Sequence, residues 1–232
     1  PRAVSNPAVS TNNLDDDDTI SGTDAVLDQI TMSPTSLTGL TILSHKLITQ
    51  SSPDAETMIR MMLAKQVGAE LDRLCVQGDG TGTDPTGVLS TTGIGAIEYT
   101  NGGNPTWADI VGLEGQLTVD SVVMQNVAYL VGPAMATTLK TTEKASSTGQ
   151  FILQGGMMND YPVQVSANVP AGTVVIGAWS EFILATWGVL EIDVDPYGSN
   201  FAKGNVSVRV ILDFDIAVQH AQAFAQLTEA AS

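Results

Sequence analysis

Residues 47–89 read LITQSSPDAETMIRMMLAKQVGAELDRLCVQGDGTGTDPTGVL, and this stretch decides the fold prediction. It opens with helix-start signals, because Ser52 can cap a helix, Pro53 suits the first helical position, and Asp54 lies beside the positive end of the helix dipole. Apolar residues then recur every three or four positions, at Ile59, Leu63, Val67, Leu71 and Leu74. The pattern predicts one amphipathic helix over residues 53–75, about 35 Å long, which suits a structural strut.

Gly78 and Gly80 are expected to end this helix, because glycine readily adopts positive φ. The following glycine-rich turn looks superficially like a nucleotide loop, but it follows a helix instead of a strand, and no Gly-Lys-Ser/Thr comes after it. Counted as a calcium loop from Asp79, it has Asp84 where the sharp bend needs glycine and Ser90 where a bidentate glutamate is needed. The sequence therefore predicts a structural turn.

Composition limits the possible functions. A chain of 232 residues with 43% hydrophobic content can bury a core. Its one cysteine, Cys75, excludes an internal disulfide and zinc sites built on several thiolates, and it fits a cytosolic origin. The formal charge of −16 opposes direct binding of phosphates, although an acidic wall suits a DNA container. Solubility alone is the alternative explanation. No run approaches the roughly 20 apolar residues of a membrane span.

The first 44 residues are predicted to form an extended arm. Residues 1–22 are polar and include the run Asp15–Asp18, which we interpret as a solvated charge run in preference to a cation site between subunits. Residues 26–44 have a strand-like pattern broken by Pro34 and Gly39, which indicates a hairpin returning to the body. The start at Pro1, without methionine or signal-peptide core, fits proteolytic maturation, truncation or a missing leader equally well.

The remainder alternates helical and strand patterns. A second helix is expected from Pro105, with an inner face of Ile110, Leu113, Leu117 and Val119. Short strands are expected at 127–131, 161–165, 173–177 and 182–185, with a helix near 134–140. From Val206 to Val218 every second residue is apolar, which predicts a long strand. The fold class is therefore α+β.

Few side chains are candidates for chemistry. His45 and His220 lie in no nucleophile motif and are expected to be polar surface or interface residues. Methionines on the predicted strut are interpreted as adaptable packing instead of a soft-metal site; they are Met58, Met61 and Met62, and the same holds for Met157 and Met158.

Two carboxylate pairs, Glu191 with Asp193 and Asp213 with Asp215, lie two residues apart on predicted strands and so share a face, which would suit acid/base catalysis. Without a recognisable pocket we expect them to be solvent-facing. The sequence therefore predicts no enzyme, and no catalytic, cofactor-binding or metal-ligating residue.

Four pieces of the chain together resemble the major capsid proteins of tailed bacteriophages, which have the Hong Kong 97 fold. These are Leu40–Ser52, the helix with its turn to Leu89, Tyr161–Phe182, and Val206–Leu227. The resemblance implies an arm and extended loop at 1–50, a peripheral domain with the spine helix at 51–120, an axial domain at 121–195, and a peripheral C-terminal strand at 196–232. It also implies that residues 195–204 form a loop at local threefold contacts.

The function implied by the resemblance is self-assembly, as pentamers and hexamers, into an icosahedral phage head around double-stranded DNA. The chain would assemble in the host cytoplasm, bind mainly its own copies, and meet decoration, scaffolding or portal proteins, with no cofactor, sequence-specific DNA contact or membrane. The alternatives are an encapsulin-type compartment shell, a carboxylate-dependent hydrolase, and a secreted adhesive domain, the last disfavoured by the missing signal sequence.

Some members of this family join a lysine of the extended loop to an asparagine near the neighbour's threefold loop. Asn200 and Asn205 are available here, but no lysine precedes Lys46, which is expected to lie too close to the spine to reach across. The sequence therefore predicts a shell held without such a bond.

Overall fold

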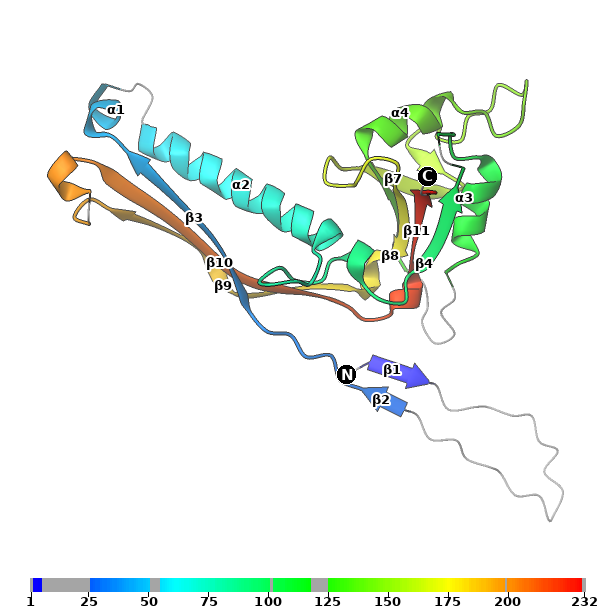
Figure 1. Ribbon diagram of the computed structural model, residues 1–232, viewed down its shortest axis with the longest axis horizontal. Helices are drawn as coiled ribbons and strands as arrows, with labels where there is room; N and C mark the ends of the chain where they lie inside the picture. The colour runs from blue at the N-terminus through cyan, green and yellow to red at the C-terminus, as the bar shows by residue number, and fades with distance from the viewer. Residues whose placement is uncertain are drawn as a thin grey trace, which may run out of the picture.

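The computed structural model describes residues 2–5, 26–50, 55–100, 102–117, 125–198 and 200–230. Their helices and strands form an elongated slab, a separate six-stranded unit, and a two-stranded arm (Figure 1). The slab consists of α2 (Ala55–Gln77), which lies against a sheet of β3 (Thr35–Leu43), β10 (Val206–Val218) and β9 (Phe182–Asp195). The short helix α1 (His45–Gln50) links β3 to α2.

Helix α2 confirms the predicted strut and, at 23 residues, spans about 34 Å. It ends two residues later than predicted, and its expected start at Ser52–Asp54 lies outside the described residues. Its apolar stripe packs on the sheet, where the buried side chains are Val67, Leu74, Val210, Leu212, Phe214 and Ile216. Near its C-terminal end, α2 also exchanges hydrogen bonds with Asn168, through Nε2 of Gln77 and the carbonyl of Ala69.

The prediction that Gly39 breaks the strand pattern is wrong. Strand β3 runs through this residue and pairs with β10 in an unbroken antiparallel register, in which Gly39 lies opposite Val210. A Cβ at position 39 would lie only 2.8 Å from Cγ1 of Val210. Glycine is therefore needed here for close packing beneath α2, since a larger residue would collide with the valine.

A two-stranded arm of β1 (Arg2–Ser5) paired antiparallel with β2 (Val26–Asp28) projects away from the slab (Figure 1), whereas β3, within the same predicted arm, pairs with β10 in the slab sheet. Pro34 directly precedes β3, as the interrupted pattern indicated. The aspartate run Asp15–Asp18 lies outside the described residues.

The six-stranded unit has the strand order β4-β11-β8-β5-β7-β6. Its strands are β4 (Gly95–Tyr99), β5 (Val127–Val131), β6 (Met157–Met158), β7 (Tyr161–Val165), β8 (Val174–Ala178) and β11 (Phe224–Glu229). Helices α3 (Trp107–Glu114) and α4 (Pro133–Thr141) complete it. The unit thus combines strands from distant parts of the chain, since β11 pairs in parallel with β4 and antiparallel with β8.

Several predicted elements are confirmed within this unit and the slab. Strands β5, β7 and β10 have the predicted bounds, and β8 starts one residue later than expected. Helix α3 begins at a capping box formed by Thr106 and Asp109, and its predicted inner face is buried at Ile110 and Leu113. Val119 lies outside the described residues. Strand β9 extends ten residues beyond its predicted end at 185, and neither β4 nor β11 was predicted.

Two short connections join the slab to the six-stranded unit. One is the turn Trp179–Glu181 between β8 and β9, and the other is Ala221–Ala223 between β10 and β11. The Trp179 ring packs edge-on against Phe224. That phenylalanine also lies over Gly177, where a Cβ would come within 2.1 Å of its ring. The junction is therefore closely packed.

Candidate functional site

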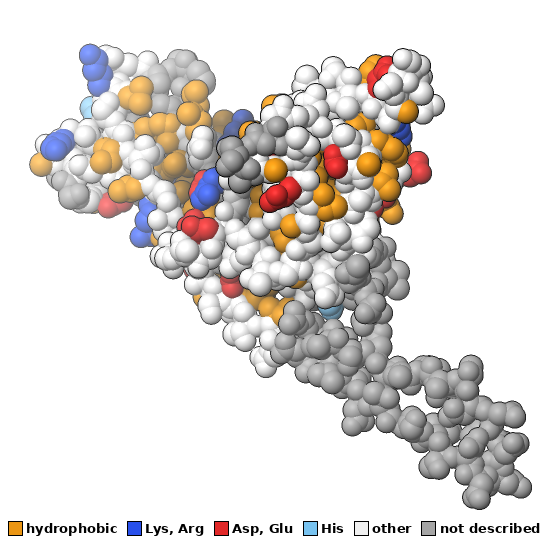
Figure 2. All heavy atoms as spheres, turned by 45° about the vertical axis from the view of Figure 1, so that its right-hand side comes forward, with side chains coloured by type: hydrophobic (Ala, Val, Ile, Leu, Met, Phe, Trp, Pro, Cys, Tyr) orange, Lys and Arg blue, Asp and Glu red, His pale blue; other side chains and the backbone are white. Residues whose placement is uncertain are grey.

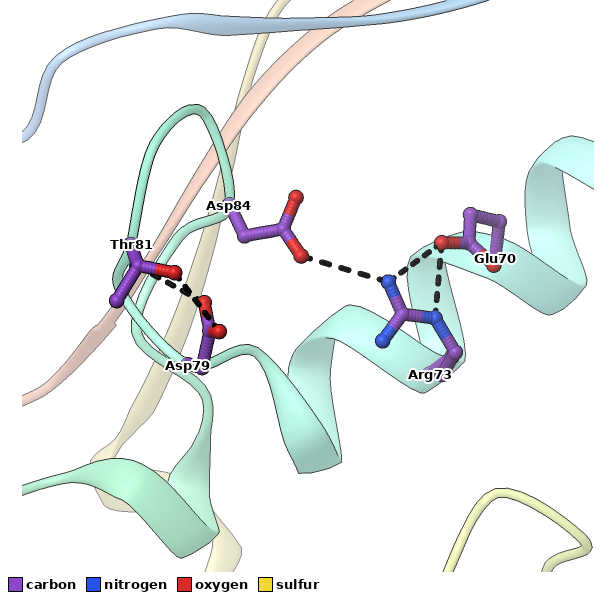
Figure 3. A network of polar contacts seen from close by, with 5 residues as sticks. All are labelled: Glu70, Arg73, Asp79, Thr81 and Asp84. Atoms are coloured by element: carbon purple, nitrogen blue, oxygen red, sulfur yellow. Dashed lines mark hydrogen bonds and ion pairs between the residues drawn. The ribbon is translucent and has the colours of Figure 1, made fainter.

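A polar network fixes the glycine-rich turn to the end of α2 (Figure 3). Arg73 donates from Nε and Nη2 to Oε1 of Glu70, at 2.8 and 2.6 Å, and Nη2 also lies 3.5 Å from Oδ2 of Asp84. Asp79 accepts hydrogen bonds from the backbone N–H and the hydroxyl of Thr81, at 2.9 and 2.8 Å. The polar groups of the turn thus contact one another, as in a structural turn.

Two glycines allow this turn to close. The N–H of Gly87 donates to the carbonyl of Gly78, and the N–H of Gly78 donates to the carbonyl of Leu74, both at 2.9 Å. A Cβ at Gly78 would lie 2.2 Å from the carbonyl oxygen of Pro85, and one at Gly87 would lie 2.6 Å from that of Leu74. The backbone therefore leaves no space for a side chain at either position.

The same contacts change the pKa values of the charged groups. Hydrogen bonds from the backbone and hydroxyl of Thr81 lower the pKa of Asp79, and the nearby Arg73 lowers it slightly further. The hydrogen bond to Glu70 raises the pKa of Arg73, with a smaller contribution from Asp84. Both groups therefore stay charged near neutral pH, which keeps the network intact.

Large apolar side chains are exposed along the slab. On β3, Leu40 has 68% of its surface exposed and Ile42 has 50%, and on β9 Val189 has 79%. The predicted packing methionines of α2 also lie on its outer side, since Met58, Met61 and Met62 are each more than half exposed. Figure 2 shows hydrophobic side chains on the surface of this part of the molecule. Such surfaces mark interaction sites.

The two carboxylate pairs are used in contacts between strands. Asp193 accepts a hydrogen bond from Nη2 of Arg209 at 2.7 Å, across β9 and β10. Asp213 accepts from the hydroxyl of Ser36, and Asp215 accepts from the backbone N–H of Ser33 at 2.7 Å. The structure therefore holds these carboxylates along the open face of the sheet and does not bring the pairs together around one pocket.

The two histidines differ in environment. His45 is exposed at the start of α1. His220 is partly buried, and its Nδ1 lies 2.7 Å from Oε2 of Glu181, whose residue surface is only 7% exposed. The backbone N–H of Gln219 also donates to the carbonyl of Glu181. This pair joins the two connections between slab and unit, a role that spacing along the sequence does not indicate.

A polar network in the six-stranded unit was also missed. The Glu114 carboxylate accepts hydrogen bonds from the hydroxyl of Tyr129 and from Nδ2 of Asn159. Burial and this carboxylate raise the pKa of Tyr129 far above its ordinary value, so its hydroxyl remains a donor. The network therefore ties α3 to β5 and to the turn before β7.

A pocket of about 410 Å³ lies between α2 and the six-stranded unit. It is mostly apolar, with Cys75, Tyr129, Trp179 and Phe182 in its lining. Burial raises the pKa of the Cys75 thiol to about 11, which keeps it protonated and poorly nucleophilic. Within the described part of the chain, no cluster of three or more potential ligands suits a metal ion, and no helix is long and apolar enough to cross a membrane.

The protein has the Hong Kong 97-like capsid fold. This class is defined by a long helix packed on one face of a sheet, a projecting arm and a second unit built on its own sheet. The sequence profile of the Phage capsid family matches residues 4–228, and the chain belongs to this family.

A curated relative is the major capsid protein of Halomonas phage phiHAP-1, which is 28% identical over 211 residues. The match covers 91% of this chain but only 35% of the relative, so the chain spans about a third of that protein's length.

Solved structures show the same fold at low sequence identity. The capsid of a native GTA particle has a TM-score of 0.79 at 17% identity, and covers 99% of this chain and 83% of its own. A chain of Gordonia phage Cozz has a TM-score of 0.74 at 14% identity, with coverages of 99% and 80%. The SrpI encapsulin complex from Synechococcus elongatus PCC 7942 scores 0.64 at 14% identity, with coverages of 88% and 77%.

Proposed function

We propose that this chain is the repeating subunit of an icosahedral phage head, assembled from pentamers and hexamers around double-stranded DNA. The observation that carries the proposal is the one-sided packing of the slab, which leaves Leu40, Met61 and Val189 exposed in a chain that matches the Phage capsid family over residues 4–228. Neighbouring copies would cover these side chains. Closed symmetric assemblies repeat one set of modest contacts many times, so their combined strength can contain DNA.

The family resemblance also suggests a role for each part of the chain. We propose that the β1–β2 arm reaches a neighbour, that the slab is the peripheral part, and that the six-stranded unit meets its copies around pentamer and hexamer centres. The expected ranges 51–120, 121–195 and 196–232 serve as a first division, but β9 lies in the slab sheet, so we assign residues 182–195 to the peripheral part instead of the axial one. Strand β4 and helix α3 belong to the six-stranded unit by packing, as does β11, and we assign them the same axial role.

The net negative charge of the chain supports a role in enclosing DNA without binding it directly. With 25 acidic and 9 basic residues, the subunit repels the phosphate backbone, so the polymer can be packed and released without adhering to the wall. Assembly would occur in the bacterial cytoplasm, where scaffolding, portal or decoration proteins are possible further partners. We infer a structural and non-catalytic role.

Sedimentation and negative-stain electron microscopy test the proposal. The purified chain is expected to form particles of several megadaltons at micromolar concentration and physiological salt, and the particles should show icosahedral outlines. A matched pair of variants identifies the surface responsible, since Met61→Asp should reduce particle formation, whereas Gln66→Asp on the same helix should not. A chain with intact termini that stays monomeric under these conditions would contradict the proposal.

The encapsulin structure supports a second candidate, a bacterial compartment that holds protein cargo. Particles purified from the native source distinguish the two functions. Nuclease-resistant double-stranded DNA inside them would support the phage head, whereas a co-purifying enzyme without DNA would support the compartment.

A further inference from the structure

The pocket between α2 and the six-stranded unit has two walls. One wall is the C-terminal half of α2, which ends beside the six-stranded unit (Figure 1) and contributes Asp72 and Cys75. The other wall includes Ala128 of β5, with Trp179 and Phe182 at the start of β9. One copy of the chain therefore supplies both walls. The volume of about 410 Å³ lies within the range of small-molecule sites, about 300–1,000 Å³.

Contacts within the chain fix the shape of this pocket. The indole N–H of Trp179 donates to the carbonyl of Ala128 at 3.1 Å, and the indole ring packs edge-on against Phe182, with ring centroids 6.1 Å apart. Asn168, in the loop after β7, is hydrogen-bonded to α2 on both its side chain and its carbonyl. The walls are therefore already positioned, so a ligand does not have to order them when it binds.

Asp72 adds one negative charge to this mostly apolar pocket. Burial raises the pKa of the neighbouring Cys75 thiol most, and the charge of Asp72 raises it further, which places the two groups close together. The adjacent cation, Arg73, is held by other carboxylates at the end of α2. Lys65, the preceding cation in the sequence, is seven residues away, about 10 Å along the helix. Among the described residues that line the pocket, none is basic.

The lining therefore selects by two properties at once. Aromatic and aliphatic walls favour an apolar body, and aromatic rings also attract cations. The carboxylate of Asp72 favours a positive group and repels an anion. A small hydrophilic cation would leave the apolar walls without a contact.

We propose that this pocket binds a small apolar cation, an amine or guanidine that carries an aromatic or branched hydrocarbon body. The body lies against Trp179 and Phe182, and the cationic group lies beside Asp72. The inference does not depend on the shell function, because one chain forms the whole site. Since the ligand contacts α2 and the six-stranded unit together, it stabilises their arrangement and should raise the thermal unfolding midpoint.

Four related probes test this selectivity by titration calorimetry on the purified chain. Phenylbutylamine has both properties and is expected to bind with a Kd of about 1 mM or lower. Phenylbutanol lacks the charge and should bind about fivefold more weakly, since an ion pair with an exposed carboxylate contributes little. Phenylbutyrate, with the opposite charge, should bind at least about tenfold more weakly. Butylamine, which lacks the ring, should show no measurable binding.

Two sets of variants locate the binding. Trp107→Phe/Trp187→Phe leaves Trp179 as the only tryptophan, and phenylbutylamine should change its fluorescence with the Kd found by calorimetry. Asp72→Asn should weaken phenylbutylamine about fivefold and leave phenylbutanol unchanged. Glu98→Gln removes the same charge from an exposed position on β4, outside the lining, and should alter neither probe.

Filling the pocket gives an independent test. Ala128→Leu and Cys75→Met enlarge side chains on opposite walls, and each should weaken phenylbutylamine at least about tenfold. Circular dichroism checks that both variants are folded, and Ala145→Leu, at an exposed loop position outside the lining, is the control.

Three results would overturn the site: phenylbutyrate binding as tightly as the amine, Asp72→Asn behaving like Glu98→Gln, or folded variants with a filled pocket binding normally. Binding to the unassembled chain but not to assembled particles would overturn it in favour of a contact between copies in the pocket. A chain that binds phenylbutylamine as expected but forms no particles would contradict the shell function and leave this site standing.

Discussion

The slab and the six-stranded unit bury their apolar residues in different ways. In the six-stranded unit, Ile110, Leu113, Tyr129 and Leu139 have no exposed surface, because α3, α4 and the sheet enclose one core. In the slab, α2 covers one face of a three-stranded sheet, and the other face exposes Leu40 and its neighbours. The core of the six-stranded unit is thus enclosed within one chain, whereas the slab leaves one face of its sheet open. Substitutions should therefore separate folding from assembly.

The largest effect is expected from Leu71→Pro in the middle of α2. Proline removes a backbone hydrogen bond and collides with the preceding turn, at a cost of about 3 kcal/mol or more. The slab should lose its helix and form no particles, as measured by circular dichroism and electron microscopy. Leu71→Met, which conserves volume and helix propensity, is the control and should assemble. Normal shells from the proline variant would contradict the role of α2 as a strut.

A smaller loss is expected from Gly78→Ala at the turn after α2. The added methyl group meets the backbone carbonyl of Pro85, which cannot move aside as a flexible side chain could. Overpacking of this kind costs about 1–3 kcal/mol. Urea denaturation should show this loss, whereas Gly82→Ala, where no atom lies within 4 Å, should cost less despite its positive φ. Equal stabilities of the two variants would disprove the close-packing explanation.

Removing a single methyl group from the core of the six-stranded unit tests how tightly that core is packed. Ile176 is fully buried on β8, so Ile176→Val should lower the free energy of unfolding by about 0.5–1.5 kcal/mol. Leu40→Ala removes more atoms but from an exposed position, and it should change the unfolding free energy by less than about 0.5 kcal/mol. If Leu40→Ala proved the more destabilising in the monomer, the slab would not be the open region that the burial pattern indicates.

The sequence predicted elements with strong periodicity and missed those defined by distant partners. Strand β10 alternates over 13 residues and α2 has a regular stripe, so local patterns sufficed for both. Strand β11 pairs with β4 across more than a hundred residues, and neither strand alone has a distinctive pattern. The predicted end of strand β9 was ten residues too early. Its register shifts around Gly188, where φ is +89°, and its exposed residues interrupt the alternation of apolar and polar positions.

The candidate surfaces were predictable only in outline. The spacing of apolar residues placed Met58, Met61 and Met62 on α2. Whether these side chains are buried depends on which face of α2 packs on the sheet, and that is set by tertiary structure. The pairing of His220 with Glu181 likewise arises where two connections cross, between residues 39 positions apart. Such contacts cannot be inferred from local sequence alone.

An assembly defect without a folding defect is expected from Met61→Ser/Met62→Ser. Both side chains are more than half exposed, so the unfolding free energy of the monomer should change by less than about 0.5 kcal/mol. The fraction of chain in particles should nevertheless fall about tenfold, because each interface loses buried apolar area. Calorimetry and sedimentation on the same sample measure the two effects. A fall in stability with unchanged assembly would reverse the comparison between the two regions.

The last prediction concerns covalent bonds between subunits, and we expect none to form. Asn200 directly precedes the helical turn Phe201–Lys203 and donates a hydrogen bond from Nδ2 to Oγ of Ser207 at 3.2 Å. A lysine in the arm would be needed to attack such an asparagine, but residues 1–45 contain none, and Arg2 cannot replace it because its guanidinium stays protonated. Particles of this chain boiled in detergent should therefore give one band near 24.2 kDa. A ladder of covalent oligomers would contradict this prediction, and its loss in Lys46→Arg would identify Lys46 as the residue that reaches across.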